Sequence, residues 1–282
     1  MQTSTQNFND QLPPDLRLAA LACLVESVPE AKVGSVNLLA DKWAAGTMHL
    51  EGLADISPVL PIPGLPAKPL LVPPLQVKRR AMHTSEGRAI LIHALAHIEF
   101  NAINLALDAI WRFAGMPVDY YADWLQVAKE EALHFSMLAA HLQSLGYRYG
   151  DFPGHNSLWD MAERTSGDIL ARIALVPRTM EARGLDASPP VRAKLAQAGD
   201  MAAAQILDII LRDEIGHVAV GNRWYAWLCA QRGLEPVATY AALAEAYQAP
   251  VMRGPFNIEA RRLAGFTEVE LDGLLASGQR ET

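Results

Sequence analysis

Two short stretches of the sequence carry the same order of chemically active side chains. "KEEALH", which ends at His134, and "RDEIGH", which ends at His217, both read base, acid, glutamate, two spacers, histidine, and they lie 83 positions apart. Residues three apart on a helix share a face, so Glu131 is expected beside His134 and Glu214 beside His217. Carboxylate oxygen and imidazole nitrogen suit iron or manganese, and no thiolate accompanies them. The repeat predicts two halves of one dinuclear metal site.

Both glutamates lie on apolar stripes, which strengthens this interpretation. The apolar helical neighbours of Glu131 are Trp124, Val127, Ala128, Phe135 and Leu138, and those of Glu214 are Leu207, Ile210, Leu211 and Val218. A buried carboxylate without a partner costs several kcal/mol or stays protonated. A bound cation removes that cost, whereas the alternative is a polar pair on a helix surface.

Two further glutamates complete the set that a two-metal helix bundle needs. Glu99 precedes Glu131 by 32 positions, and Glu181 precedes Glu214 by 33. By analogy with such sites, Glu131 and Glu214 would bridge the two metals and carry the catalytic role, while Glu99 and Glu181 would be terminal ligands. His134 and His217 would each bind one metal, which gives two Fe or Mn ions per chain.

The acids just before the repeated glutamates are expected to orient the histidines. Glu130 and Asp213 can accept the second imidazole N–H. Because neighbours on a helix point about 100° apart, each acid would serve the histidine of the other stretch. Exposed surface acids are the alternative for both, and Glu181 can instead be an ion-pair partner of Arg178 and Arg183.

Four long helices are predicted to position these residues, and no segment shows the alternation of a strand. The first starts at Thr84 or Ser85 and runs to about Phe113, and the second ends near Leu145. The third covers roughly 158–183, with a kink at Pro177, and "RGLDASPP" is expected to end it. The fourth runs from about 191 or 199 to 231. Two tight pairs with a long connection between them are the outline of an all-α four-helix bundle with one crossover.

The remaining segments lie outside this bundle, which we place at 84–235. Residues 1–57 are expected to form an N-terminal helical extension, and 236–282 to form short helices. The Pro-rich segment 58–83 is expected to be extended and packed on the bundle, because its prolines disfavour helix while its Leu and Val favour burial. A flexible linker is the alternative.

Composition restricts the class of protein. The chain has 282 residues, is 51% hydrophobic and carries a net charge of −7, which argues against nucleic acid or an anionic membrane as the main partner. Cys23 and Cys229 form no motif, the N-terminus shows no signal peptide, and no apolar run reaches the length of a membrane span. A soluble cytoplasmic protein is expected, and a homodimer is plausible.

Four stretches resemble a known family. "EGRAILIHALAHIEFNAINLALDA", "EEALHFSMLAAHLQSLGYRYGDFPGHNSLWDMA", "LVPRTMEARGLDASP" and "RDEIGHVAVGNRWY" are similar to the bacterial ferritin-like family called domain of unknown function 455, over about 70–275. The resemblance implies a ferritin-like fold of the di-iron carboxylate superfamily. That superfamily includes oxygen-activating hydroxylases and oxidases, ribonucleotide reductase subunits, manganese catalases and ferritins, so the fold alone does not select an activity.

The activity expected from these observations is an oxidoreductase with a di-iron or mixed Fe/Mn centre. It would use O₂ to oxidise or hydroxylate an unknown small organic substrate, and the sequence identifies no electron donor. Metal storage or detoxification is one alternative, and an interaction protein that a metal merely stabilises is another. The other histidines, including His93 and His97, and the aromatic residues Tyr120, Tyr121 and Trp124 are expected to serve packing and hydrogen bonding.

Overall fold

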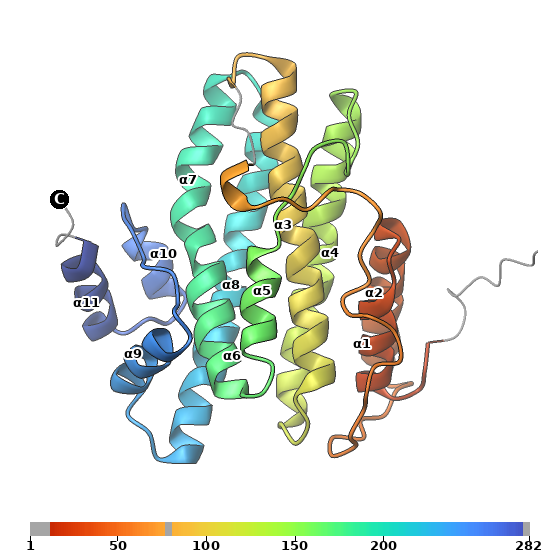
Figure 1. Ribbon diagram of the computed structural model, residues 1–282, viewed down its shortest axis with the longest axis vertical. Helices are drawn as coiled ribbons and strands as arrows, with labels where there is room; N and C mark the ends of the chain where they lie inside the picture. Colours follow the sequence, from red (N-terminus) through yellow and green to blue (C-terminus); the bar gives the residue numbers. More distant parts are fainter. Residues whose placement is uncertain (1–11, 77–80, 279–282) are drawn as a thin grey trace, which may run out of the picture.

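The computed structural model describes residues 12–76 and 81–278 of the chain, and this part is all-helical. The described ranges contain no β-strand. Two isolated β-bridges join Asp15 to His49 and Leu71 to Gly154. The long helices stand side by side with nearly parallel axes, and the terminal additions flank them on opposite sides (Figure 1). The all-α prediction is confirmed.

The long elements pack as two neighbouring pairs. Helix α3 lies along α4 and α7 lies along α8, while α4 also contacts α8 and joins the pairs. The elements are α3 (Ser85–Arg112), α4 (Val118–Ser144), α8 (Met201–Arg232) and the continuous run α6 (Ile169–Leu175), η3 (Val176–Glu181) and α7 (Ala182–Gln197).

Local capping explains where these helices begin and end. Thr84 caps α3 by accepting a hydrogen bond from the Gly87 N–H, and Asp200 caps α8 by accepting from Ala203. Gly146 follows α4 with φ +85° and Gly233 follows α8 with φ +63°, conformations that glycine adopts without strain. The predicted bounds of the first and second helices, and the later start of the fourth, agree with the structure.

The third predicted helix is wrong in two places. It is interrupted between α5 (Ser157–Arg164) and α6, where Asp168 caps α6 through the Leu170 N–H. Conversely, "RGLDASPP" does not end the helix, because α7 continues through Pro189 and Pro190. Tertiary contacts outweigh the local signal there. Leu185 is buried, and Asp186 binds Arg261 of a C-terminal helix.

The kink expected at Pro177 takes the form of the π-helical segment η3. Proline lacks the N–H that a regular helix needs and clashes with the carbonyl one turn back. A wider turn relieves the clash, and such turns are frequent at functional sites. Glu181 is the last residue of η3, so the irregularity lies directly before a predicted ligand.

The N-terminal residues form two helices and an irregular strap. Helix α1 (Leu16–Val25) packs on α3 and α2 (Pro29–Ala44) on α4. The strap follows and includes the short helix η2 (Pro74–Gln76). Two backbone hydrogen bonds hold the strap against the helices. The Gly64 N–H donates to the Leu24 carbonyl, and the Val72 N–H donates to the Gly154 carbonyl. The part of 58–83 at 77–80 lies outside the described residues.

Three short helices close the chain on the other side (Figure 1). These are α9 (Pro236–Ala246), α10 (Ile258–Leu263) and α11 (Glu268–Gly278). Helix α9 contacts α6 and α8, and α10 contacts α7 and α8. Short helices were expected in these places.

Among the described residues, only α3 is long and apolar enough to cross a membrane. Most of that helix is buried inside the protein. It also carries Glu99 and Asp108, both buried. The burial of α3 is that of a helix in the core of the bundle.

Candidate metal centre

The predicted ligands come from all four long elements of the bundle. Glu99 lies on α3, Glu131 and His134 on α4, Glu181 at the end of η3, and Glu214 and His217 on α8. Glu99, Glu131, His134 and Glu214 each offer a ligand atom, and these atoms lie within 4.8 Å of one another. All four side chains are buried.

The carboxylate of Glu131 lies between the two histidines. Its Oε2 atom is 3.3 Å from Nδ1 of His134, and its Oε1 atom is 3.0 Å from Nδ1 of His217. His134 Nδ1 also lies 3.2 Å from Glu99 Oε2, and His217 Nδ1 lies 3.9 Å from Glu214 Oε1. The site therefore has two halves that share one carboxylate.

The outer acids contact the histidines in the crossed manner that helix geometry predicts. Nε2 of His134 lies 3.1 Å from Asp213 Oδ2, and Nε2 of His217 lies 2.8 Å from Glu130 Oε2. Each acid therefore lies on one helix pair and contacts the histidine of the other pair. With Nε2–H donating outward, Nδ1 of each ring is left to face the carboxylates.

Several polar atoms at the site have no hydrogen-bond partner within the described residues. These are Glu181 Oε2, Glu214 Oε2 and His217 Nδ1, all buried. His217 Nδ1 is close to Glu131 but lies outside hydrogen-bond geometry. Buried polar atoms without partners are rare and require an explanation. A bound cation supplies one, because it would accept the lone pairs of all three.

Glu181 is not an ion-pair partner of Arg178. The Arg178 guanidinium instead donates to Asn222 Oδ1 and to Glu270 on α11. Glu181 is close enough to the other ligands that the charge of Glu131 raises its pKa, after the larger effect of burial. The structure thus places Glu181 with the cluster, although less tightly than the other glutamates.

Burial disfavours the charged forms of the clustered glutamates, as the directions of their pKa shifts indicate. Burial, and then the charge of Glu131, raises the pKa of Glu99 to about 8 and that of Glu214 well above its usual value. Burial also raises the pKa of Glu131, but His217 and His134 outweigh it and hold that pKa well below its usual range. Burial lowers the pKa of His134, yet Glu131 and Glu99 raise it to about 11.

The donor set fits a metal pair. Six buried oxygen and nitrogen ligands, with no cysteine among them, are the type that iron and manganese accept. Glu99 and His134 would hold one ion, Glu181 and His217 would hold the other, and Glu131 and Glu214 would be shared between them. The outer acids would set the orientation of both imidazoles.

A cavity of about 650 Å³ reaches three of these carboxylates, Glu99, Glu181 and Glu214. Its walls come from α3, α5, η3, α7 and α8, with Pro74 of the strap and Val251–Pro255 of the C-terminal region. The sequence gives no sign of this cavity, because its walls come from segments far apart in the chain.

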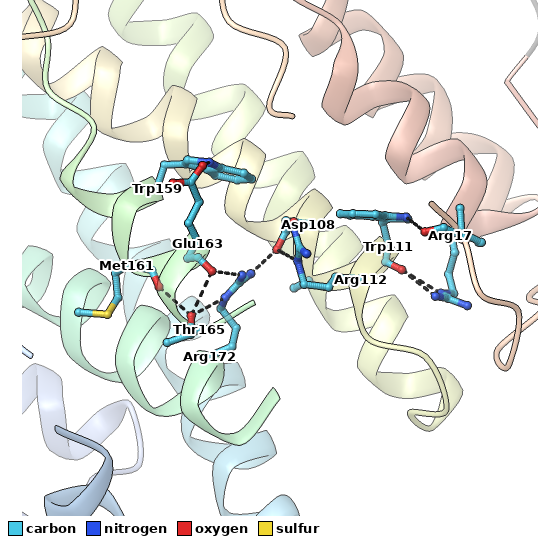
Figure 2. A network of polar contacts seen from close by, with 12 residues as sticks. Arg17, Asp108, Trp111, Arg112, Trp159, Met161, Glu163, Thr165 and Arg172 are labelled. Atoms are coloured by element: carbon cyan, nitrogen blue, oxygen red, sulfur yellow. Dashed lines mark hydrogen bonds and ion pairs between the residues drawn. The ribbon is translucent and has the colours of Figure 1, made fainter. Parts of the chain in front are cut away.

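A buried polar network holds the turn between α5 and α6 in place, and the sequence did not predict it. Arg172 on α6 donates to Asp108 on α3, to Thr165 Oγ1 and to the Ala162 carbonyl (Figure 2). Asp108 also accepts from Arg112 at 2.7 Å. The network ties α3 to the α5–α6 turn, so it fixes the position of α6, which continues directly into η3 and Glu181.

The other residues considered for chemistry serve the core. Tyr120, Tyr121 and Trp124 are buried, and the ring of Tyr120 meets each of the other two edge to edge. His97 lies within hydrogen-bond distance of Tyr149 Oη and of the His155 carbonyl, and His93 accepts from the Gly150 N–H. The packing interpretation of these residues is confirmed.

Comparison with known proteins identifies a family and a relative that this chain resembles. The model of a family described as "Protein of unknown function (DUF455)" matches residues 25–272. An "Uncharacterized protein" of Haemophilus influenzae is 49% identical over 253 residues, which cover 86% of this chain and 88% of that protein. No solved structure matches the chain.

Proposed function

The chain belongs to the family described as "Protein of unknown function (DUF455)", and from that premise we propose that its buried Glu/His cluster is a dinuclear iron or manganese centre. We propose further that the bundle is of the ferritin-like type, and that the protein is an oxygen-dependent oxidoreductase acting on a small organic molecule. A cytoplasmic location belongs to the same proposal.

The observation that carries the proposal is the position of Glu131. Each of its two oxygens faces a different histidine, at 3.3 and 3.0 Å, and each histidine is held from behind by an acid of the other hairpin. A helix-surface polar pair would not be buried or crossed in this way. A carboxylate shared by two imidazole-bearing half-sites is the arrangement that a bridging ligand requires.

The side chains of the cluster would each have a defined task. Glu131 and Glu214 would bridge, Glu99 and Glu181 would complete the two halves, and Glu130 and Asp213 would keep Nε2 of each histidine protonated. Iron or manganese would supply one-electron chemistry with dioxygen, which no side chain of the cluster provides. The apolar walls of the adjoining cavity would exclude water from the reacting centre.

Metal content tests the proposal first. The full-length protein is purified, loaded anaerobically with Fe(II) or Mn(II), desalted and analysed by plasma mass spectrometry. We expect about two metals per chain, and for iron an oxygen-dependent near-ultraviolet absorption band. Many irons per chain would indicate storage instead, and no metal at any loading would overturn the dinuclear centre.

The Glu131→Ala/Glu214→Ala double variant locates the site. It should lose both metals, because each half depends on the carboxylates that bridge them. The Glu26→Ala/Glu245→Ala double variant, which removes two acids outside the cluster, serves as the control and should retain both. Two metals in the first double variant would show that the ions bind elsewhere.

A further inference from the structure

The cavity beside the cluster has a buried end and an exposed end with different chemistry. At the buried end lie the carboxylates of Glu99, Glu181 and Glu214. At the exposed end lies Arg183 on α7, which is exposed to solvent. Because the cavity touches both, it connects the surface to the cluster.

The wall between the two ends is mainly apolar. It is lined by Leu95, Ile98, Ala102, Met180, Leu207 and Ile210 among others. Cavities that bind small molecules have this character, with few polar groups and a volume of roughly 300–1,000 Å³. The volume of about 650 Å³ is in that range.

The charge at the exposed end is positive. Asp186, the acid that lines the cavity near Arg183, is already neutralised by Arg261 at 2.6 Å and accepts a hydrogen bond from the Asn257 N–H. In the described ranges of the chain, the Arg183 side chain makes no hydrogen bond or ion pair. Its guanidinium is free to bind an anion, and its planar fork suits a carboxylate.

We propose that this cavity binds an amphiphilic organic anion. The apolar body of the ligand lies between α3, α7 and α8, and its anionic group binds Arg183. The inference deepens the proposed function by naming the substrate class, and it rests on that function only for the reaction. Binding itself needs no metal and is measured separately.

Gly184 offers a way to close the cavity without damaging the fold. It lines the cavity, and a Cβ added there meets no atom within 4 Å. Glycine inside a helix is also less favourable than most other residues. A Gly184→Phe side chain would therefore occupy the cavity while the helix stays intact. Gly273 on α11 has equally open surroundings and serves as the matched control.

The test is isothermal titration of the full-length protein with decanoate and with decanol. We expect the unaltered protein to bind decanoate at least tenfold more tightly than decanol. Arg183→Gln should remove that difference, while Arg192→Gln, an exposed arginine on the same helix that pairs with Asp208, should keep it. Gly184→Phe should weaken both ligands at least tenfold, and Gly273→Phe should weaken neither.

Three results would overturn the inference. One is the absence of binding of either probe to the unaltered protein. Another is unchanged binding in Gly184→Phe, with helicity checked by circular dichroism. The third is equal loss in Arg183→Gln and Arg192→Gln, which would indicate nonspecific attraction. Metal content is measured on the same samples, so a protein that binds decanoate but no metal contradicts only the proposed function.

Discussion

At the scale of single residues, the crossed outer acids favour the proposed metal centre over a chance cluster. Asp213 faces Nε2 of His134 at 3.1 Å, although its own neighbour in sequence is Glu214. Such outer partners fix the tautomer and the orientation of a ligand histidine.

We therefore expect Asp213→Ala to lower metal affinity by about 10- to 100-fold with little change in fold. The control is Asp208→Ala on the same helix, which removes an exposed acid that pairs with Arg192 and should leave the affinity unchanged. Both are measured by competition for Mn(II) with a chelator of known affinity. Equal affinities in the two variants would contradict the orienting role of Asp213.

Lys32 lies away from the site and is a buried amine whose hydrogen-bond partners are all uncharged. Its Nζ donates to the carbonyls of Leu24 and Gly64 and to Asn104 Oδ1, so the amine links α2 to α1, the strap and α3. Burial lowers the pKa of Lys32 from 10.5 to about 7. The neutral amine is therefore the form that the folded protein prefers above that pH.

The lowered pKa of Lys32 predicts that the stability of the folded protein rises with pH. Between pH 7 and 10.5 the unfolded chain holds the lysine proton and the folded chain has lost it. The free energy of unfolding should therefore increase by about 2 kcal/mol from pH 7 to pH 9 at this residue. Urea unfolding at both pH values measures it. Lys32→Met should abolish the increase, whereas Lys194→Met, at an exposed position of α7, should preserve it.

At the scale of elements, the position of Glu181 depends on how η3 rests on α8. A Cβ at Gly221 of α8 would lie 2.7 Å from the Cβ of Pro177. Arg178 holds the same segment through Asn222 and Glu270, and Thr179 Oγ1 lies 2.9 Å from Tyr240 Oη. The C-terminal helices thus support a segment that supplies a proposed ligand.

Gly221→Ala should separate η3 from α8. We expect a loss of about 1–3 kcal/mol in unfolding free energy, which is the usual cost of overpacking, together with weaker metal binding through Glu181. Gly216→Ala lies on the same helix with no atom within 4 Å of the added Cβ, and it should be neutral or stabilising. Thermal unfolding and metal content are measured for both. Similar melting temperatures would show that η3 does not depend on this contact.

At the scale of the whole molecule, the buried carboxylates would make the stability of the fold depend on a bound cation. Burial raises the pKa values of Glu99, Glu181 and Glu214, so the metal-free protein must keep these groups protonated or meet a desolvation cost. A metal that binds only the folded state adds stability in proportion to the logarithm of its concentration over Kd.

Removal of the metal should consequently lower the melting temperature. Differential scanning calorimetry with added Mn(II) and with chelator should differ by several degrees at metal concentrations about 100-fold above Kd, where the gain is about 2.7 kcal/mol. A Glu131→Gln/Glu214→Gln double variant should melt at one temperature in both conditions. If chelator does not change the melting temperature of the unaltered protein, a metal in the core is contradicted.

The sequence by itself determined the helical class, most helix ends and the six proposed ligands. Those features are local or periodic: Thr84 and Asp200 cap helices, Gly146 and Gly233 end them, and glutamate and histidine three apart must share a helix face. Even the crossed contacts of Glu130 and Asp213 followed from the angle between helical neighbours.

Only the tertiary structure decided the break after α5, the passage of α7 through Pro189 and Pro190, and the cavity that ends at Arg183. Each depends on contacts between residues far apart in the chain, such as Arg172 with Asp108 and Arg261 with Asp186. Local propensities amount to a few tenths of a kcal/mol for an ordinary residue and to about 3 kcal/mol for a proline inside a helix. The burial of several side chains together exceeds these costs, because each large apolar side chain that is fully buried contributes about 1.5–3 kcal/mol.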